Sequence, residues 1–407
     1  MAPPAGATTD RRDWPAVVVG GGPAGLATSR ELKRRGIAHV VLERGERVGA
    51  VWTQLYDSLV LHTGRHLSAL PGLPMPRSVP LFPKRSDVIA YLAEYAQAFG
   101  LPVATNVDVA RIERGSDRWC LTTSAGAFTA RALVMATGIV SSPRIAHFAG
   151  EEDYRGRLVH SRAYRRPADV PGQRVLVVGV GNSGGEIAAE LAQAGRTVDV
   201  AVRSGANVVP LTLAGIPIQY FGHFLLKLPR PLGNAIARGA GRLVELRRGP
   251  SPLPRAAVAP LEAIPLIGFH LVDAIRAGRI GVRPGIARLT AGGAMFTDGT
   301  SASYEAIILA TGYRAALEPL GDLIRRDARG NAIRTDRVTS GDQQNLYFLG
   351  LNQDASGGLR NIAVDAPLAA RKLAQTLAMG AKHRADDGMV GARRAGASEP
   401  AIRRPNP

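Results

Sequence analysis

The sequence contains a single cysteine, Cys120, among its 407 residues. One thiol cannot form an intramolecular disulfide, a dithiol redox pair or a thiolate metal cluster. Any redox chemistry must therefore come from a bound cofactor, and we expect no metal site.

Lysine and acidic residues are also scarce. The chain has 33 Asp and Glu residues against 51 Lys and Arg, which gives a formal net charge of +18. The arginines are spread along the chain instead of gathering in one basic segment, so we expect no nucleic-acid partner. With 45% hydrophobic and 21% charged residues, the composition is that of a globular protein. Nearly all of the positive charge is arginine, because the only lysines are Lys33, Lys84, Lys227, Lys372 and Lys382.

The two ends of the chain lack the apolar periodicity of folded segments. Residues 1–13 contain no apolar run of signal-peptide length, so we expect a flexible tail and a cytoplasmic location. Residues 381–407 carry arginine pairs among Gly, Ala and Pro, and are predicted to form a disordered basic tail.

Between the tails, one strand–turn–helix–strand unit occurs twice, at residues 16–43 and 174–203. In each copy an apolar strand runs into the pattern G-x-G-x-x-G, a helical stretch follows, and a second apolar strand ends the unit. The three glycines are Gly20, Gly22 and Gly25 in the first copy and Gly179, Gly181 and Gly184 in the second.

These glycines have the spacing that binds a dinucleotide. The first permits the tight turn out of the strand, the second lets a pyrophosphate approach the backbone, and the third lets the helix pack closely on the strand. The pyrophosphate then binds free N–H groups at the helix N-terminus. The sequence therefore predicts an α/β fold with two Rossmann-like dinucleotide-binding domains. We expect further cofactor contacts from Pro23 and Ala24 in the first unit and from Asn182 and Ser183 in the second. For Asn182 and Ser183, capping of the helix is the alternative.

The residue that ends the second strand of each unit indicates which dinucleotide that unit prefers. Glu43 is a carboxylate that can accept hydrogen bonds from ribose hydroxyls, so the first unit favours FAD or NAD. Arg203 is predicted to occupy the matching place in the second unit, where a guanidinium can pair with the 2′-phosphate of NADP. An ordinary solvated arginine is the alternative.

Two further segments, 133–138 and 307–312, are each an apolar strand that ends in Ala-Thr-Gly. Such small residues let the chain pass close to a cofactor or to a crossing between domains, although a strand followed by a turn is the simpler interpretation. We expect Ala136, Thr137 and Gly138 to contact the first cofactor.

Residues 154–165 read Y-R-G-R-L-V-H-S-R-A-Y-R, directly before the second unit. They resemble the fingerprint F-x-G-x-x-x-H-x-x-x-(Y/F)-(K/R) of the flavin-dependent monooxygenases that bind both FAD and NADPH, with Tyr154 in place of Phe. The resemblance implies an interdomain linker in which His160 is structural. The ending Tyr164-Arg165 is similar to the N/S-oxygenating and plant-type branches, more than to the Baeyer–Villiger branch.

Over residues 15–375 the chain resembles the YUCCA-like branch of this family, which makes auxin from indole-3-pyruvate. The resemblance implies that NADPH reduces FAD, that O2 adds at flavin C4a, and that the hydroperoxide transfers one oxygen atom to a small organic substrate. N/S-oxygenation and oxidative decarboxylation of an indole-3-pyruvate-like 2-oxo acid both stay open, as do Baeyer–Villiger chemistry and an oxidoreductase or oxidase without oxygen transfer. The shared segments are residues 56–62, 82–84, 91–96, 181–184 with Glu186, and 306–313.

Four more residues are expected near the flavin. Trp52 could form a wall of the flavin ring, with an ordinary half-buried Trp as the alternative. His62 is the candidate catalytic residue: many relatives have Asn there, whereas the YUCCA-like branch has His. It could hydrogen-bond the peroxide or the substrate, and a core or surface histidine is the alternative. Arg44 and Val109 complete the expected FAD contacts.

The expected order is an FAD domain (14–170 and 312–380) interrupted by an NADPH domain (171–311) with an apolar insertion at about 205–250. Residues 208–226 contain no charged residue, but Pro210, Gly215 and Pro217 would break a membrane-spanning helix. We interpret the insertion as a cover over the substrate entrance. A peripheral membrane contact through residues 208–248 is the alternative.

Overall fold

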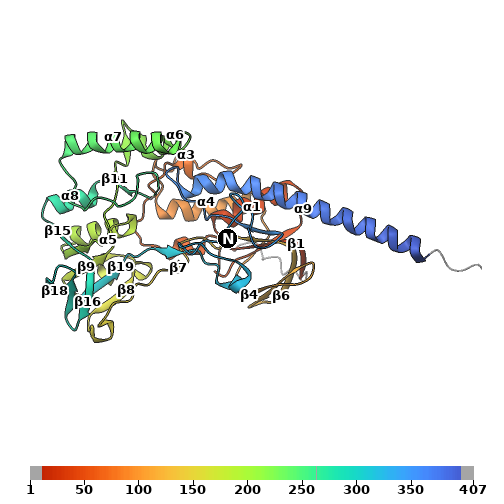
Figure 1. Ribbon diagram of the computed structural model, residues 1–407, viewed down its shortest axis with the longest axis horizontal. Helices are drawn as coiled ribbons and strands as arrows, with labels where there is room; N and C mark the ends of the chain where they lie inside the picture. Colours follow the sequence, from red (N-terminus) through yellow and green to blue (C-terminus); the bar gives the residue numbers. More distant parts are fainter. Residues whose placement is uncertain (1–11, 263, 396–407) are drawn as a thin grey trace, which may run out of the picture.

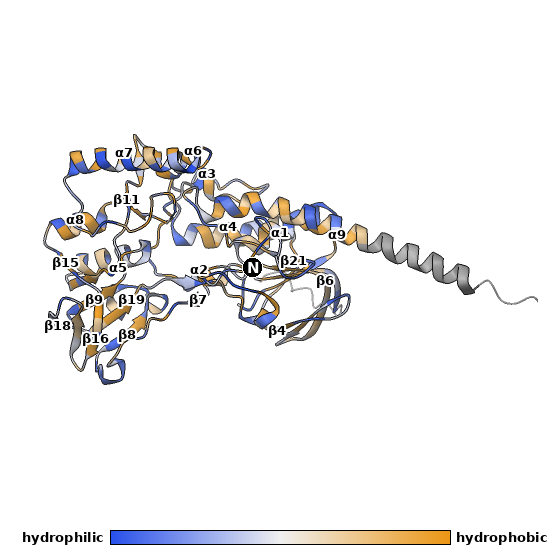
Figure 2. Ribbon diagram, in the orientation of Figure 1, coloured by the Kyte–Doolittle hydropathy of each residue, from blue (hydrophilic) through white to orange (hydrophobic). Residues whose placement is uncertain are grey.

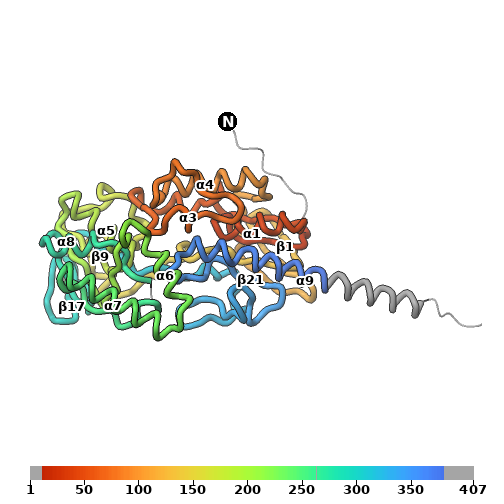
Figure 3. The backbone as a smooth tube through the Cα atoms, turned by 90° about the horizontal axis from the view of Figure 1, so that it is seen from above, coloured from red at the N-terminus to blue at the C-terminus, as the bar shows by residue number. Residues whose placement is uncertain are grey.

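The structure, a computed structural model, describes residues 12–262 and 264–395. Two domains lie side by side, and helix α9 (Gly358–Ala395) packs against α1 (Pro23–Arg34) of the first domain (Figure 1). The view from above shows the same arrangement, with α9 beside β21 (Figure 3). Residues 1–11 of the expected N-terminal tail and 396–407 of the expected basic tail lie outside the described residues.

The first domain is built on a seven-stranded sheet in the order β3-β2-β1-β6-β5-β4, with β21 also paired to β6. Strands β3, β2, β1, β6 and β21 are parallel, whereas β4, β5 and the first half of β6 form an antiparallel meander. The strands are β1 (Asp13–Val19), β2 (His39–Leu42), β3 (Val103–Ala104), β4 (Val109–Arg114), β5 (Trp119–Thr123), β6 (Gly126–Met135) and β21 (Leu346–Phe348).

The second domain repeats this plan. Its five-stranded sheet is parallel throughout, in the order β15-β10-β9-β19-β8, and a three-stranded antiparallel meander, β16-β17-β18, precedes β19. The two predicted Rossmann-like domains are therefore present. The strands are β8 (Arg157–His160), β9 (Arg174–Val178), β10 (Thr197–Ala201), β15 (Ile280–Arg283), β16 (Ile286–Thr290), β17 (Gly293–Phe296), β18 (Ser301–Ser303) and β19 (Ala306–Leu309).

Both central sheets are covered on both faces. In β1, Ala16 and Val18 pack under the helices, whereas Val17 and Val19 pack against the meander, because successive side chains alternate between the two faces. Such strands form continuous apolar runs, which appear orange in β9 and β19 (Figure 2). The covering helices are α1 with α4 (Arg85–Ala98) and α9 in the first domain, and α5 (Asn182–Gln193) with α8 (His270–Arg276) in the second.

The chain crosses between the domains twice, through the antiparallel pair β7 (Ser142–Pro143) and β20 (Tyr313–Arg314). The Ala-Thr-Gly ends of β6 and β19 lie at these crossings. The Thr137 hydroxyl donates to the carbonyl of Ala316 at 2.6 Å, and the Thr311 hydroxyl donates to the carbonyl of Arg144. Each crossing segment thus accepts a hydrogen bond from the threonine that follows the strand leading into the other crossing.

The boundary expected after residue 170 is wrong. Strand β8 pairs with β19 and so belongs to the second sheet, at the edge position that β21 occupies in the first. The reason is topological: β8 follows the first crossing, so the chain has already entered the second domain when it forms.

The apolar insertion lies between β10 and β15 and extends beyond residue 250, because β14 (Leu266–Ile267) pairs with β11 (Val208–Val209). Prolines and glycines divide its apolar part into short elements, as predicted. In the described part of the chain, no helix is long and apolar enough to span a membrane. The other elements of the insertion are β12 (Thr212–Leu213), β13 (Ile216–Pro217), α6 (Ile218–Leu225) and α7 (Arg230–Arg248).

Helix α9 also corrects the prediction of a disordered tail from residue 381, because it continues to Ala395. The segment is rich in Ala and Arg, which favour helix, and no proline interrupts residues 368–395. The remaining short helices are α2 (Ala50–Thr53), α3 (Arg65–Ser68), η1 (Glu151–Asp153), η2 (Ser161–Ala163), η3 (Pro167–Asp169) and η4 (Glu318–Leu323).

Candidate functional site

A groove of about 690 Å³ runs along the carboxyl ends of the first sheet. Glu43 and Arg44, the glycine-rich turn, Trp52 and His62 all line this groove. The groove thus brings together most of the residues predicted to bind the first cofactor. Those that line it are Gly20, Gly22, Pro23, Ala24, Glu43, Arg44, Trp52, His62, Val109, Ala136, Thr137 and Gly138, with Asn182 and Ser183 of the second domain.

The glycine-rich turn has the shape that a pyrophosphate requires. Gly20 has a φ of +106°, and a Cβ there would lie 2.5 Å from the carbonyl oxygen of Ala136. Gly22 faces open space, so nothing blocks a phosphate from the helix N-terminus. Gly25 does not line the groove; its missing side chain lets α1 approach the Gly20 carbonyl.

Glu43 directly follows β2 and is held in place by the backbone. It is 8% exposed, and its two carboxylate oxygens accept hydrogen bonds from the N–H groups of Gly21 and Gly45, both at 2.7 Å. The carboxylate is therefore fixed beside the turn, at the edge where a ribose would lie. Together, the open turn and the fixed carboxylate fit the adenosine diphosphate half of FAD.

The second turn repeats the geometry of the first. Gly179 has a φ of +101°, Gly181 faces open space, and a Cβ on Gly184 would lie 2.1 Å from the carbonyl oxygen of Gly179. None of these three glycines lines the first groove. The second turn therefore offers a separate pyrophosphate cradle at the N-terminus of α5.

Asn182 does not cap helix α5. Gly181 occupies the N-cap position, and the Asn182 amide reaches across to the insertion instead. Its nitrogen donates to the carbonyl of Pro265 at 3.1 Å, and its oxygen accepts from the N–H of Ile267 at 2.9 Å. The side chain thus ties the second nucleotide turn to strand β14.

Arg203 lies one residue beyond the place predicted for it. Leu42 pairs with Val19 and Ala201 with Val178, so Glu43 corresponds to Val202 and Arg203 corresponds to Arg44. Val202 is buried, whereas the Arg203 side chain is exposed beside Gly285. Among the described residues it forms no hydrogen bond or ion pair, so its guanidinium is available to a ligand.

Glu186 of α5 connects the two domains. Its Oε1 lies 2.5 Å from His62 Nε2, and its Oε2 accepts a hydrogen bond of 2.6 Å from the Tyr56 hydroxyl. Burial and the adjacent carboxylate raise the pKa of Tyr56, so its hydroxyl stays a neutral donor. Since Nε2 of His62 is occupied by Glu186, only Nδ1 remains for a ligand in the groove.

Glu186 has no role predicted from the sequence, although it is shared with the YUCCA-like branch. The available signal was the pair Glu186 and Glu190, two carboxylates one turn apart on an otherwise uncharged helix. Glu190 accepts a hydrogen bond of 2.8 Å from the Tyr164 hydroxyl, so both carboxylates fasten α5 to tyrosines outside it.

His160 lies at the domain crossing, as the fingerprint implies for a structural residue. Its Nδ1 accepts from the N–H of Arg162 at 3.1 Å, and its Nε2 lies 3.0 Å from the carbonyl of Gly312. Burial lowers the pKa of His160, which favours the neutral ring with a proton on Nε2. Both ring nitrogens are therefore used to hold the crossing.

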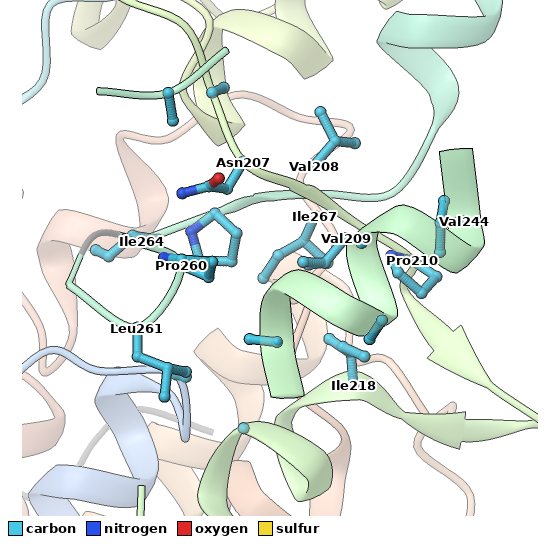
Figure 4. Close-up of a pocket in the computed structure, with 18 of the residues that line it drawn as sticks. Asn207, Val208, Val209, Pro210, Ile218, Val244, Pro260, Leu261, Ile264 and Ile267 are labelled. Carbon is cyan, nitrogen blue, oxygen red and sulfur yellow. The ribbon is translucent and has the colours of Figure 1, made fainter. Parts of the chain in front are cut away.

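A second cavity of about 1120 Å³ lies under α6 and α7. Its wall is mainly apolar, and Figure 4 shows Val208, Ile218 and Ile267 among the side chains that line it. The cavity meets the first groove, because Thr63, Ile139, Gln353 and Gly358 line both. The insertion thus encloses a space next to the predicted flavin site.

Comparisons with known proteins agree with the fold and with the family that the sequence resembles. Residues 17–209 match the family described as pyridine nucleotide-disulphide oxidoreductase. The chain is 33% identical over 327 residues to indole-3-pyruvate monooxygenase YUCCA1 of Oryza sativa subsp. japonica, covering 77% of this chain and 80% of that protein. It is 30% identical over 339 residues to an uncharacterized CzcO-like oxidoreductase of Geobacillus kaustophilus (strain HTA426), covering 82% and 90%. A flavin-containing monooxygenase from Stenotrophomonas maltophilia shares the fold with a TM-score of 0.72 and 26% identity, covering 89% and 99%.

We expect the Glu186→Ala substitution to slow hydride transfer from NADPH to the flavin by about tenfold, equal to ~1.4 kcal/mol. The substitution removes the carboxylate that holds the two domains together at His62, and hydride transfer depends on that alignment. Anaerobic stopped-flow measurement of flavin reduction at saturating NADPH checks it. The NADPH Kd should change by no more than about twofold, because the carboxylate acts on orientation.

Glu190→Ala is the matched control, since it removes a carboxylate from the next turn of α5 without touching His62. This variant should reduce its flavin at nearly the wild-type rate. If the rate of flavin reduction and the melting temperature fall in parallel in both variants, Glu186 only stabilises the structure.

Proposed function

Because the chain belongs to the flavin-dependent monooxygenases that include the YUCCA enzymes, we propose that it oxidatively decarboxylates an aromatic 2-oxo acid. One atom of O2 enters the acid product, and the bond between the oxo carbon and the carboxyl carbon breaks to release CO2. The other oxygen atom leaves as water, and NADPH supplies the two electrons. The 33% identical rice protein is named for indole-3-pyruvate, which is an acid of this class.

The observation that carries the proposal is the large apolar cavity that meets the first groove. An aromatic side group fits an apolar wall, and the groove brings the cofactor to the junction between the two spaces. Arg238, Arg242 and Arg255 line the cavity, and in the described part of the chain none of them has an ion-pair partner. These cations attract an anionic substrate such as a 2-oxo acid.

FAD and NADPH are the cofactors of this family. In the first groove, the Gly20–Ala24 turn would hold the pyrophosphate of FAD, Glu43 its ribose, and Trp52 would lie beside its ring. When bound, FAD supplies the chemistry of hydride acceptance and oxygen activation. The chain itself positions the reactants and keeps water away from them.

His62 is the polar side chain that we place next to the reaction. It lines the groove at the end where Thr63 also lines the cavity, and Glu186 holds its Nε2. With Nε2 held in this way, Nδ1 is the ring nitrogen that is left for a ligand. We therefore assign it the role of a hydrogen-bonding partner of the substrate or of the oxygen that is transferred.

Arg203 is the residue that we assign to the 2′-phosphate of NADPH. It follows the second strand of the unit and is exposed and unpaired among the described residues, beside the Gly285 backbone. A guanidinium pairs well with a phosphate, whereas NADH offers only a hydroxyl at that place.

We expect Arg203→Ala to raise the KM for NADPH by roughly 10- to 100-fold, because one charge-assisted contact is worth about 1.5–3 kcal/mol. The KM for NADH should change by less than about twofold, which steady-state kinetics with both nucleotides measures. Arg174→Ala is the matched control, since Arg174 lies exposed at the opposite end of β9. Equal effects on the two nucleotides would refute the assignment.

The reaction itself is tested by incubating the FAD-loaded enzyme with NADPH, O2 and indole-3-pyruvate. We expect indole-3-acetate and CO2 to form in about equal amounts with the NADPH consumed, while H2O2 stays a minor product. NADPH consumption that yields only stoichiometric H2O2 points to the alternative, an oxidase without oxygen transfer.

We also propose that the outer surface of the insertion contacts an anionic membrane. Helix α7 exposes Leu232 and Leu246 outside the cavity, with Leu246 84% exposed, and Ile236 and Leu243 continue this apolar stripe to the rim of the cavity, which they also line. Arg242 and Arg247 flank this stripe, which is the pattern of a helix that lies on a membrane surface. Helices α6 and α7 lie together at one edge of the molecule (Figure 1). A cytoplasmic location stays our prediction from the sequence.

The protein should therefore sediment with vesicles that contain about one third phosphatidylserine, and rising salt should weaken that binding. The double variant Leu232→Asp, Leu246→Asp should lose most of the bound fraction, since a charge replaces apolar contact at both ends of the stripe. Ile145→Asp, which changes a 50% exposed side chain outside the insertion, is the control. Equal binding by wild type and double variant rules out this contact.

A further inference from the structure

Gln219 is a buried amide without a hydrogen-bond partner. It is 2% exposed, and neither Oε1 nor Nε2 has a partner among the described residues. Leaving a buried polar group unpaired is costly, so most such groups in folded proteins are paired. Of the unpaired buried side chains in the described part of the chain, Gln219 alone lines the large cavity.

The position of α6 places Gln219 near the junction of the two spaces. Pro217, just before the helix, packs against Gly64, and a Cβ on Gly222 would lie 2.6 Å from the carbonyl oxygen of Ala355. Gln219 lies between these two contacts, so it is held between residues 62–64 and 353–357. Both of those segments contribute residues that line the groove and the cavity together.

An unpaired amide in an apolar cavity binds a ligand that carries a polar group able to form a hydrogen bond with it. The Nε2–H group can donate to a carbonyl or carboxylate oxygen, whereas a purely apolar ligand leaves the amide unpaired. Arginines outnumber the two carboxylates, Glu245 and Asp354, in the lining of the cavity, and this excess of cations favours anions among the ligands that carry such oxygens.

We propose that Gln219 is a substrate-binding residue that donates a hydrogen bond from Nε2 to an oxygen of the 2-oxo acid, while the aromatic group fills the cavity under α7. This inference rests on the proposed function for the identity of the acid. It adds the residue that orients the acid toward the first groove and discriminates against aromatic compounds that lack a hydrogen-bond acceptor.

The experiment compares wild type with Gln219→Met and Gln219→Glu. Methionine keeps the length of the side chain and removes its polar group, and glutamate keeps the shape and repels an anion. Melting temperature and flavin content establish that each variant is folded; Gln219→Met should melt at or above the wild-type temperature, because it removes an unpaired buried group. Asn207→Ala is the matched control, since Asn207 lines the same cavity but its amide donates to the carbonyl of Val258.

Calorimetric binding of indole-3-acetate and of indole to the FAD-loaded protein is the direct readout, and it does not depend on turnover. Wild type should bind indole-3-acetate at least about tenfold more tightly than indole, and Gln219→Met should lose that preference. Gln219→Glu should bind indole-3-acetate more weakly still, whereas Asn207→Ala should keep the preference.

The kinetic counterpart is a rise of about tenfold or more in the KM for indole-3-pyruvate in Gln219→Met, with the KM for NADPH unchanged. If wild type forms the acid product and Gln219→Met keeps both the wild-type KM and the preference, the inference about Gln219 fails and the proposed function stands. If wild type forms no product yet the preference exists and depends on Gln219, the proposed function fails and Gln219 remains the acid-binding residue.

Discussion

The double crossing of the chain between the two domains is the constraint on which the rest of the structure depends. Two short segments connect the sheets, and they are hydrogen-bonded to each other and to the threonines that end β6 and β19. His160 uses both of its ring nitrogens at the same place. Because the crossings are short and paired, the carboxyl ends of the two sheets face a common region. Asn182 and Ser183 of the second turn line the first groove, and the cavity under the insertion meets that groove.

Glu186 adds a charged contact between the two domains, beside the double crossing of the chain. Its carboxylate contacts one histidine and one tyrosine of the first domain, so a single side chain of α5 aligns two side chains of its partner. The carboxylate is partly exposed, and such groups contribute little to global stability. Its importance is therefore geometric, because it fixes the orientation of His62 relative to the second nucleotide turn.

The parts of the fold that depend on residues close together in the sequence could be predicted from it. The turns at Gly20–Gly25 and Gly179–Gly184 are local patterns, so both nucleotide domains were predicted correctly, and most of the residues predicted to contact the first cofactor line one groove. The place of Arg203 was wrong by one residue, because the end of a strand depends on its register with the next strand. Strand β8 was assigned to the wrong sheet, because its partner, β19, lies about 150 residues later in the chain. The ties from Glu186 to Tyr56 and His62 span more than 120 residues, and no local pattern reports them.

The two hydrogen bonds of the Asn182 side chain bear on how the two binding sites influence each other. Its amide joins the first turn of α5 to Pro265 and Ile267, and both of those residues line the cavity. One side chain thus belongs at once to the cradle for the second nucleotide and to the support of the substrate wall. If a ligand in the cavity displaces these two residues and thereby changes the affinity for the nucleotide, linkage requires the nucleotide to change the affinity for that ligand by the same factor. One amide would then couple the two binding sites of a two-substrate enzyme.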